Sequence, residues 1–377
     1  MKTVIAIDSF KGSLSSFEAG KAAAEGIKRV FPDADTKVFA MADGGEGTVD
    51  AIISALSGRI RYVNVHDPLG RKVRAKYGII PKTHTAVIEM AEAGGLTLVE
   101  DNLRDPMYTS TYGVGEMIAD AIGAGCRDFI IGIGGSATND GGTGMLSALG
   151  VRFLDKDGKE IMRGARGLEA LYRIETENAL KELRECRFSV ACDVTNPLCG
   201  EKGCSAVFAP QKGADAESVK LMDRYLARYA ELTGKIFKDS DPEYPGSGAA
   251  GGLGFAFRSY LGAKLRRGID IVTEAINIEE AIASADIVIT GEGRLDAQTC
   301  MGKAPAGIAK LSKKHGKTVI AFAGAIADGA SDCNENGIDA FFPILKAPCS
   351  LAEAMDAENA RKNLADTAEQ VFRLLKL

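Results

Sequence analysis

Residues 3–56 decide the fold, and they read TVIAI (3–7), DSFKGSLS, SFEAGKAAAEGIKRV (16–30), FPDAD, TKVFAM (36–41), ADGGE and GTVDAIISAL (47–56). The two runs rich in β-branched and apolar residues are typical of strands, and the two longer stretches have the periodicity of amphipathic helices. A strand-helix-strand-helix order predicts a parallel sheet with right-handed crossovers.

The same alternation returns near the C-terminus. The pattern predicts strands at 286–290, 318–323 and 340–344, a helix at 304–315 and a long charged helix at 351–377. Three strands here and two at the N-terminus match the five strands of a flavodoxin-like sheet. We therefore expect one discontinuous α/β domain, made of residues 1–60 plus 285–377.

The middle of the chain has a different pattern. Residues 59–80 alternate apolar and polar side chains around DPLG (67–70), which predicts a hairpin or meander. Further helices are predicted at 112–124 and 214–232, strands at 129–133 and 188–191, and a glycine-rich turn at 246–254. We expect residues 61–284 to form a second α/β domain inserted into the first.

Composition excludes several classes of protein. The chain has 377 residues, a net charge of -5 and no basic block interleaved with aromatic residues, so nucleic acid is not an expected partner. No signal peptide pattern and no apolar run near the roughly 20 residues of a membrane helix occur, so we expect a cytoplasmic protein without a membrane partner. Three isolated histidines and eight cysteines without a C-x-x-C pair argue against a zinc site, a serine-histidine triad and a disulfide framework.

Five polar, glycine-rich segments follow predicted strands. They are DSFKGS (8–13), DGGEGT (43–48), GIGGSATNDGGTG (132–144), ACDVTNPLCG (191–200) and TGEGRLDAQT (290–299). Ligands of open parallel sheets bind outside the carboxyl ends of the strands, so these segments are the candidate site.

The first two segments each precede a predicted helix, whose N-terminal N–H groups favour anions. Their candidate binding residues are Asp8, Ser9, Asp43, Gly44, Gly45 and Glu46, and Lys11 offers a mobile positive charge. Helix capping by Ser13, Ser15 or Asp43 is the structural alternative.

The third and fourth segments combine glycine backbone with hydroxyl and amide groups, which suits a phosphate or a polyoxygenated ligand. Candidate binding residues are Gly134, Gly135, Ser136, Thr138, Asn139 and Asn196. Asp193 follows a predicted strand without an obvious basic partner, and it is our candidate for the general base.

The fifth segment carries two carboxylates, Glu292 and Asp296, and the guanidinium of Arg294. A surface ion pair between Arg294 and Asp296 is the structural alternative. The motifs G-x-x-x-x-G-K-[ST], G-x-G-x-x-G, H-R-D and D-F-G are absent. Carboxylates that hold Mg²⁺, a few cations and glycine backbone are nevertheless the inventory of phosphoryl transfer.

In this order, the five segments resemble those of the class I glycerate kinase family of bacteria, over essentially the whole chain. The resemblance implies transfer of the γ-phosphoryl of ATP to D-glycerate, giving 2-phospho-D-glycerate with the 3-phosphate as the alternative product, in sugar-acid or glyoxylate catabolism. It also implies a flavodoxin-like domain paired with an α/β domain of restriction-enzyme-like fold. It leaves open the oligomeric state, with a homo-oligomer as one option, and which segment holds ATP and which holds glycerate.

Residue chemistry then suggests individual roles. Glu292 and Asp296 would hold Mg²⁺, Asp193 would accept or orient the hydroxyl proton, and Lys11 and Arg294 would bind the substrate carboxylate or the transferring phosphoryl group. Two other functions remain as alternatives. One is a nicotinamide-dependent hydroxy-acid dehydrogenase, although its dinucleotide motif is absent, and the other is a small-molecule-binding sensor module.

Overall fold

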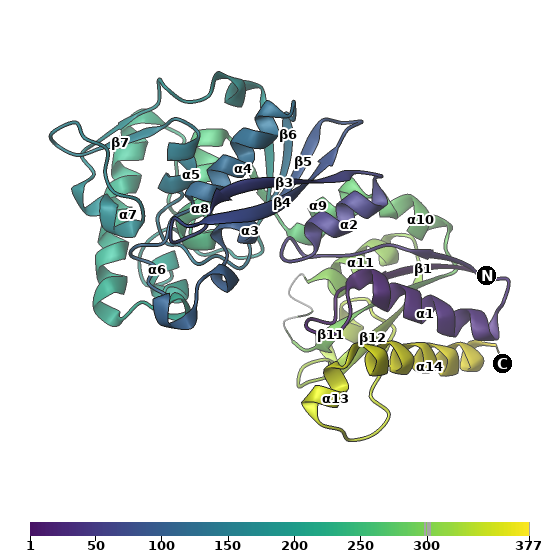
Figure 1. Ribbon diagram of the computed structural model, residues 1–377. Helices are drawn as coiled ribbons and strands as arrows, with labels where there is room; N and C mark the ends of the chain where they lie inside the picture. The colour runs from purple at the N-terminus through teal and green to yellow at the C-terminus, as the bar shows by residue number, and fades with distance from the viewer. Residues whose placement is uncertain (298, 300–302, 377) are drawn as a thin grey trace. The chain divides into compact units, whose positions relative to one another are not determined.

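The computed structural model describes residues 1–297, 299 and 303–376. Its chain divides into two units (Figure 1). The first contains Met1–Asp43, Asp50–Leu56 and the residues from Ile269 onward, and the second contains Gly44–Val49 and Ser57–Gly268. The boundaries of folding domains that the sequence suggests, after residues 60 and 284, stay a prediction.

The first unit is built on a five-stranded parallel sheet. Its strands are β1 (Lys2–Ile7), β2 (Asp35–Val38), β11 (Ile287–Leu295), β12 (Thr318–Ile326) and β13 (Ala340–Pro343). The spatial order β13-β12-β11-β1-β2 places β1 between β11 and β2, with Ile5 opposite both Ile289 and Val38. Counted along the unit, this is the order 2-1-3-4-5 of flavodoxin-like sheets. The predicted α/β fold with a parallel sheet is confirmed.

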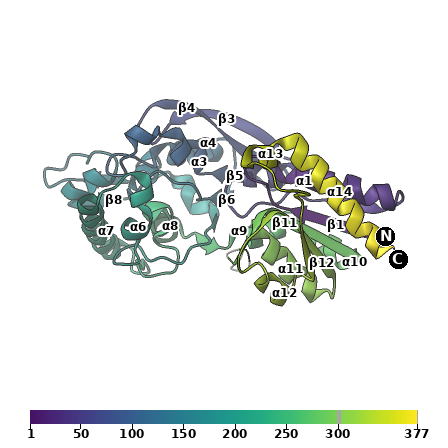
Figure 2. The ribbon, with the colours of Figure 1, turned by 90° about the horizontal axis from the view of Figure 1, so that it is seen from below.

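Helices cover both faces of this sheet. The helices of this unit are α1 (Ser16–Val30), α2 (Thr48–Ala55), α9 (Gly268–Ala275), α10 (Ile278–Ser284), α11 (Ala304–Lys314), α12 (Asp332–Glu335), α13 (Leu351–Met355) and α14 (Ala357–Leu375). Figure 2 shows α1 and α14 side by side on one face and α11 on the other. The core between α1, α14 and the strands includes Ile27, Leu364 and Phe372, all fully buried.

Local sequence explains where these helices begin. Ser15 caps α1, because its Oγ accepts from the Glu18 N–H while the Glu18 carboxylate accepts from the Ser15 N–H at 2.9 Å. The predicted helix over 16–30 is confirmed. The single helix predicted over 351–377 is wrong: Asp356 has an extended backbone and caps α14 by accepting from the Asn359 N–H, which separates α13 from α14.

Three strands end at least three residues away from the predicted end, and one of them is β12, which continues to Ile326 instead of ending at residue 323. β2 ends at Val38 rather than at residue 41, whereas β11 continues to Leu295 instead of ending at residue 290. The continuation is paired, since Glu292 lies opposite Ala323 and Arg294 opposite Ala325 of β12. Part of the fifth polar segment is therefore strand, and the sheet fixes its backbone.

The second unit contains a six-stranded sheet in the order β10-β9-β6-β5-β4-β3. Its strands are β3 (Arg59–His66), β4 (Lys72–Ile80), β5 (Thr85–Glu89), β6 (Asp128–Gly132), β9 (Arg187–Ala191) and β10 (Lys264–Arg266), and β7 (Arg152–Leu154) pairs with β8 (Arg173–Glu175). From β5 to β10 the sheet is parallel, while β3 and β4 form an antiparallel hairpin. The hairpin predicted over residues 59–80 is confirmed.

The helices of this unit pack around a second core. They are α3 (Ala91–Gly94), α4 (Tyr112–Gly123), α5 (Thr143–Ala148), α6 (Cys204–Phe208), α7 (Ala216–Ile236) and α8 (Ala249–Leu261), with short 3₁₀ helices η1 (Leu96–Leu98), η2 (Asp101–Leu103), η3 (Ala165–Ala170), η4 (Lys181–Glu185) and η5 (Pro210–Lys212). The rings of Phe129 and Phe188 stack across β6 and β9 with centroids 4.7 Å apart. Across the described residues, no helix has both the length and the apolarity needed to cross a bilayer.

The close approach of α1 to α14 gives a test of the first core. A Cβ atom at Gly26 would lie 2.0 Å from the Ala365 carbonyl oxygen, so Gly26→Ala should force the two helices apart. Overpacking of this kind costs about 1–3 kcal/mol. We expect a lower free energy of unfolding for the first unit in chemical denaturation.

The matched control is Gly123→Ala, because Gly123 is also helical and a Cβ there would meet nothing within 4 Å. Its stability should stay equal or rise slightly, since alanine is the better helix former. A Gly26→Ala protein as stable as the wild type would contradict the close packing of α1 on α14.

Candidate active site

The first group of candidate residues lies at the carboxyl ends of β1 and β11. Asp8 follows β1, its N–H donates to the Gly291 carbonyl at 2.8 Å, and its carboxylate accepts from the Ser9 N–H at 2.7 Å. Burial raises the pKa of Asp8 to about 7, helped by the charges of Asp43 and Glu292 and opposed by the Ser9 hydrogen bond and by Lys11. The carboxylates of Asp8, Asp43 and Glu292 therefore lie close together, although they belong to three separate segments of the sequence.

Glu292 is almost fully buried in β11. Its Oε1 accepts a short hydrogen bond from the Thr299 hydroxyl, and its Oε2 lies 3.8 Å from the Lys303 ammonium. Burial raises the pKa of Glu292, whereas Thr299 and Lys303 oppose the shift. Sequence reasoning gave Thr299 and Lys303 no role, although both lie in or just after the fifth polar segment.

Lys303 also lies 3.7 Å from Asp296 Oδ1, so one ammonium serves both predicted metal ligands. The Arg294 Nε lies 3.8 Å from Asp296 Oδ2, and 69% of the Arg294 side chain is exposed. The ion pair that was the structural alternative is therefore present, but it is long. It leaves most of the guanidinium accessible to an anion.

Glu292 and Asp296 are the candidate ligands of a metal ion. Within residues 1–297, 299 and 303–376, no group of three or more His, Cys, Asp or Glu side chains is arranged to hold a metal ion. Mg²⁺ commonly binds through one or two carboxylates together with substrate phosphates. Glu292 and Asp296, which share Lys303, fit that second mode rather than an all-protein cage.

The second group of candidate residues belongs to the second unit. There the turn that begins at Gly44 packs on the ends of β6 and β9: a Cβ at Gly132 would lie 2.2 Å from the Gly44 carbonyl oxygen, and one at Gly44 would lie 2.4 Å from the Ala191 Cβ. The Val49 N–H donates to Glu89 at the end of β5 at 2.8 Å. Close backbone contact explains why this segment is rich in glycine.

The glycine-rich loop over residues 132–144 has an exposed tip and a buried base. Gly134 and Gly135 are exposed, whereas Thr138, Asn139 and Asp140 have no exposed surface. The Asp140 carboxylate accepts from the Thr111 N–H at 2.8 Å, and also from the Thr111 hydroxyl and the N–H groups of Gly142 and Gly144. Burial raises the pKa of Asp140 against these hydrogen bonds.

This arrangement buries two of the predicted residues. Thr138 and Asn139 were predicted to contact a ligand, but both side chains are completely buried, and the Asn139 amide donates to Ser205 Oγ at 2.9 Å. The Thr138 hydroxyl and the Asn139 amide oxygen are buried without a hydrogen-bond partner among the described residues, and their contact with a ligand stays a prediction.

Lys212, in η5, is a further residue that sequence reasoning missed. Its ammonium donates to Ser136 Oγ at 2.8 Å and to the Thr138 carbonyl at 2.6 Å, and only 2% of the residue is exposed. Nothing in the local sequence distinguishes it from a surface lysine. Its burial depends on the loop from residue 132 folding over it.

The fourth segment adds Asp193 and Asn196. Asp193 follows β9, is exposed, and accepts from the Gly268 N–H at 3.1 Å. The Asn196 amide donates to the Lys202 carbonyl at 2.8 Å, and the Asn196 carbonyl accepts from the Gly248 N–H. Asp193 is therefore accessible to a substrate, whereas the Asn196 side chain is engaged in holding its own loop.

The predicted site residues thus form two groups. The first unit holds Asp8, Ser9, Lys11, Asp43, Glu292, Arg294 and Asp296, and the second holds Gly44, Gly45, Glu46, Gly134, Gly135, Ser136, Thr138, Asn139, Asp193 and Asn196.

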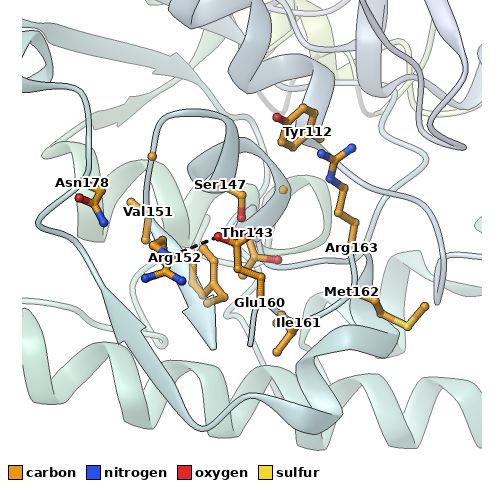
Figure 3. A pocket seen from close by; sticks show the side chains of 13 residues that line it. Tyr112, Thr143, Ser147, Val151, Arg152, Glu160, Ile161, Met162, Arg163 and Asn178 are labelled. Carbon is orange, nitrogen blue, oxygen red and sulfur yellow. Dashed lines mark hydrogen bonds and ion pairs between the residues drawn. The ribbon is translucent and has the colours of Figure 1, made fainter. Parts of the chain in front are cut away.

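A cavity of about 300 Å³ also lies in the second unit, and none of the predicted residues lines it. In it, Arg152 pairs with Glu160 at 3.2 Å, and the Arg163 guanidinium lies 3.3 Å from the ring centroid of Tyr112 (Figure 3).

The raised pKa of Asp8 predicts a pH-dependent stability. The pKa of Asp8 is about 7 in the folded protein and 3.8 in its ordinary, unburied state. The folded protein therefore loses stability as the pH rises from about 4 to 7, because Asp8 ionises less readily when folded. Asp8→Asn removes this loss, so its melting temperature should exceed that of the wild type at pH 8 and approach it at pH 5. The control, exposed Asp33→Asn, should match the wild type at both values. If the melting temperatures of Asp8→Asn and the wild type differ by the same amount at pH 5 and pH 8, the pKa of Asp8 is not raised.

Comparison with known proteins identifies the family. The model of the glycerate kinase family matches residues 3–376. A glycerate kinase of Bacillus subtilis is 47% identical over 377 residues (100% of this chain, 98% of the relative), and a glycerate 2-kinase of Escherichia coli is 46% identical over 372 residues (97% and 98%). A crystal structure from Salmonella typhimurium LT2, provisionally assigned as glycerate kinase 2, superposes with a TM-score of 0.90 at 46% identity, covering 100% of this chain and 98% of the other. The resemblance noted in the sequence is confirmed, and the chain belongs to the glycerate kinase family.

Proposed function

We propose that this protein transfers the γ-phosphoryl group of ATP to the 2-hydroxyl of D-glycerate, giving 2-phospho-D-glycerate and ADP. Relatives named glycerate kinase and glycerate 2-kinase, at 47% and 46% identity over nearly their whole length, support the substrate and the hydroxyl. The observation that carries the proposal is the group of mutually repelling carboxylates Asp8, Asp43 and Glu292 beside Lys11 and Lys303.

Such a group suits phosphoryl transfer because this reaction needs little covalent chemistry from the protein. Catalysis rests on positioning the reacting oxygens and on balancing charge that spreads over the transferring group. Glu292 and Asp296 would hold Mg²⁺, which neutralises charge on the phosphates when it is bound. Lys11, which is exposed, and Arg294, whose side chain is 69% exposed, are accessible to the substrate carboxylate or the transferring phosphoryl group.

The glycine-rich segments of the second unit would supply backbone N–H groups that donate hydrogen bonds to the anionic groups of the substrates. Gly44, Gly45 and Glu46 lie in the turn against β6 and β9, and the tip of the loop at Gly134 and Gly135 is exposed beside it: a Cβ at Gly134 would lie 3.4 Å from the Gly45 Cα. Backbone N–H groups at such turns bind oxyanions without reorganisation. Both turns are therefore assigned to the anionic parts of the two substrates.

Two carboxylates are candidates for the general base that accepts the proton of the attacking hydroxyl. Asp193 is exposed and oriented by the Gly268 N–H, which suits a group that contacts substrate. Asp8 has a pKa of about 7, matched to proton acceptance near neutral pH. We assign the general base to Asp193 and keep Asp8 as the second candidate.

The position of the phosphoryl group on the product tests the reaction itself. Incubation with ATP, Mg²⁺ and D-glycerate should give ADP and a single phosphate ester, whose phosphorus NMR signal coincides with that of added 2-phosphoglycerate. A signal that coincides with 3-phosphoglycerate would overturn the choice of hydroxyl. Formation of NADH from NAD and glycerate would instead favour the dehydrogenase, and binding without turnover would favour the sensor.

Asp193→Asn tests the general base. Loss of a positioned base lowers kcat by about 100-fold or more, while the affinity for ATP, measured by calorimetry, should stay within a few-fold of the wild type. The control is Asp157→Asn, an exposed aspartate outside the polar segments, which should keep full activity. Near-normal turnover in Asp193→Asn, together with a large loss in Asp8→Asn, would transfer the role to Asp8.

A further inference from the structure

Lys212 is a buried cation without an anionic contact. Its ammonium donates to two neutral oxygens, Ser136 Oγ and the Thr138 carbonyl, and within the described part of the chain it makes no ion pair. The ammonium has three N–H groups, so one of them lacks a protein acceptor. Burial of an unpaired charge is unfavourable, which favours a counter-anion nearby.

The turn that Lys212 contacts through Ser136 offers a place for that anion. The N–H groups of Gly134, Gly135 and Ser136 donate to no acceptor in residues 1–297, 299 and 303–376. Gly135 has a left-handed backbone with φ of 72°, and both glycines are exposed. Successive N–H groups in such a turn form a concave site for an oxyanion.

The nearby ionisable groups do not neutralise Lys212 by contact. The Asp140 carboxylate accepts from the hydroxyls of Ser110 and Thr111 and from the N–H groups of Thr111, Gly142 and Gly144, and Cys204 donates its thiol proton to the Leu198 carbonyl. Burial lowers the pKa of Lys212 to about 8, and Cys204 and Asp140 oppose this shift only in part. A bound anion would therefore favour the charged ammonium.

We propose that the backbone turn Gly134–Ser136 is an oxyanion-binding site and that Lys212 is its positioning residue. Lys212 orients the turn through Ser136 Oγ and the Thr138 carbonyl and supplies positive potential beneath it. The ligand is an oxyanion group, either the carboxylate of glycerate or a phosphate of the nucleotide. Naming these two sources rests on the proposed function.

Calorimetry with Lys212→Met tests this site. Methionine fills a similar volume without the charge, so the protein should fold, while the affinity for one ligand among D-glycerate, ADP and inorganic phosphate should fall by about 10- to 100-fold, the value of a charge-assisted hydrogen bond. The ligand that binds more weakly to the variant shows whether the oxyanion is the carboxylate of glycerate or a phosphate of the nucleotide. The control is Lys220→Met, an exposed lysine on α7, which should bind like the wild type.

The pH dependence separates a charged role from a merely structural one. The ratio of wild-type to Lys212→Met affinity cancels the ionisation of the ligand, and it should approach one between pH 7.5 and 9.5 as Lys212 loses its proton. If Lys212→Met does not fold, the wild type decides alone. Its affinity for at least one of D-glycerate, ADP and inorganic phosphate must fall at least about fivefold over this range, because pH 9.5 lies about 1.5 units above the pKa of Lys212, and a flat profile for all three ligands overturns the proposal.

The two proposals can fail separately. A Lys212→Met protein that binds all three ligands as tightly as the wild type, or a wild type that binds none, overturns the oxyanion site. A wild type that binds phosphate or ADP in a Lys212-dependent way but does not phosphorylate glycerate refutes the proposed function and leaves the oxyanion site intact.

Discussion

The parallel pairing of β1 with β11 is the constraint on which the first unit depends. It joins strand β1 near the N-terminus to residues 287–291. The sheet can therefore form only when two segments pair that are separated in the sequence by the whole second unit. Closing so long a loop costs conformational entropy before any contact compensates for it. The same pairing places Asp8 beside Glu292, because Ile7 lies opposite Gly291 in the register. Fold and candidate site in this unit therefore have one origin.

Each unit also buries ionisable side chains. Asp8 and Glu292 in the first unit, and Asp140 and Lys212 in the second, are all nearly or completely buried. Asp140 is compensated by five hydrogen-bond donors and serves the structure of its loop. Asp8 is repelled by its neighbours, and Lys212 contacts only neutral oxygens. The uncompensated charges mark the places where a ligand or an ion would lower the free energy, which is why perturbed groups cluster at functional sites.

Sequence and structure agree where local chemistry suffices. The capping box of Ser15 and Glu18 set the start of α1, and the alternating pattern with its DPLG turn predicted the β3–β4 hairpin. They disagree where neighbours decide. β11 continues through Glu292 and Arg294 because β12 pairs with it, although glycines and charges there indicated a loop. Thr138 and Asn139 are buried instead of exposed: the Asn139 amide donates to Ser205, and the Thr138 backbone carbonyl accepts from Lys212.

By itself, the sequence determined the α/β class, the flavodoxin-like strand inventory, the family and the segments that carry the site, because each depends on local pattern or on ordered motifs. Only the tertiary structure decided that Asp8, Asp43 and Glu292 repel one another, that Lys303 serves both Glu292 and Asp296, and that Lys212 lies buried under the turn at Gly134. The reason is physical. A side chain's burial, partners and pKa depend on residues from other segments of the chain, such as Glu292 for Asp8 and Ser136 for Lys212, and no local pattern shows which of them will be its neighbours.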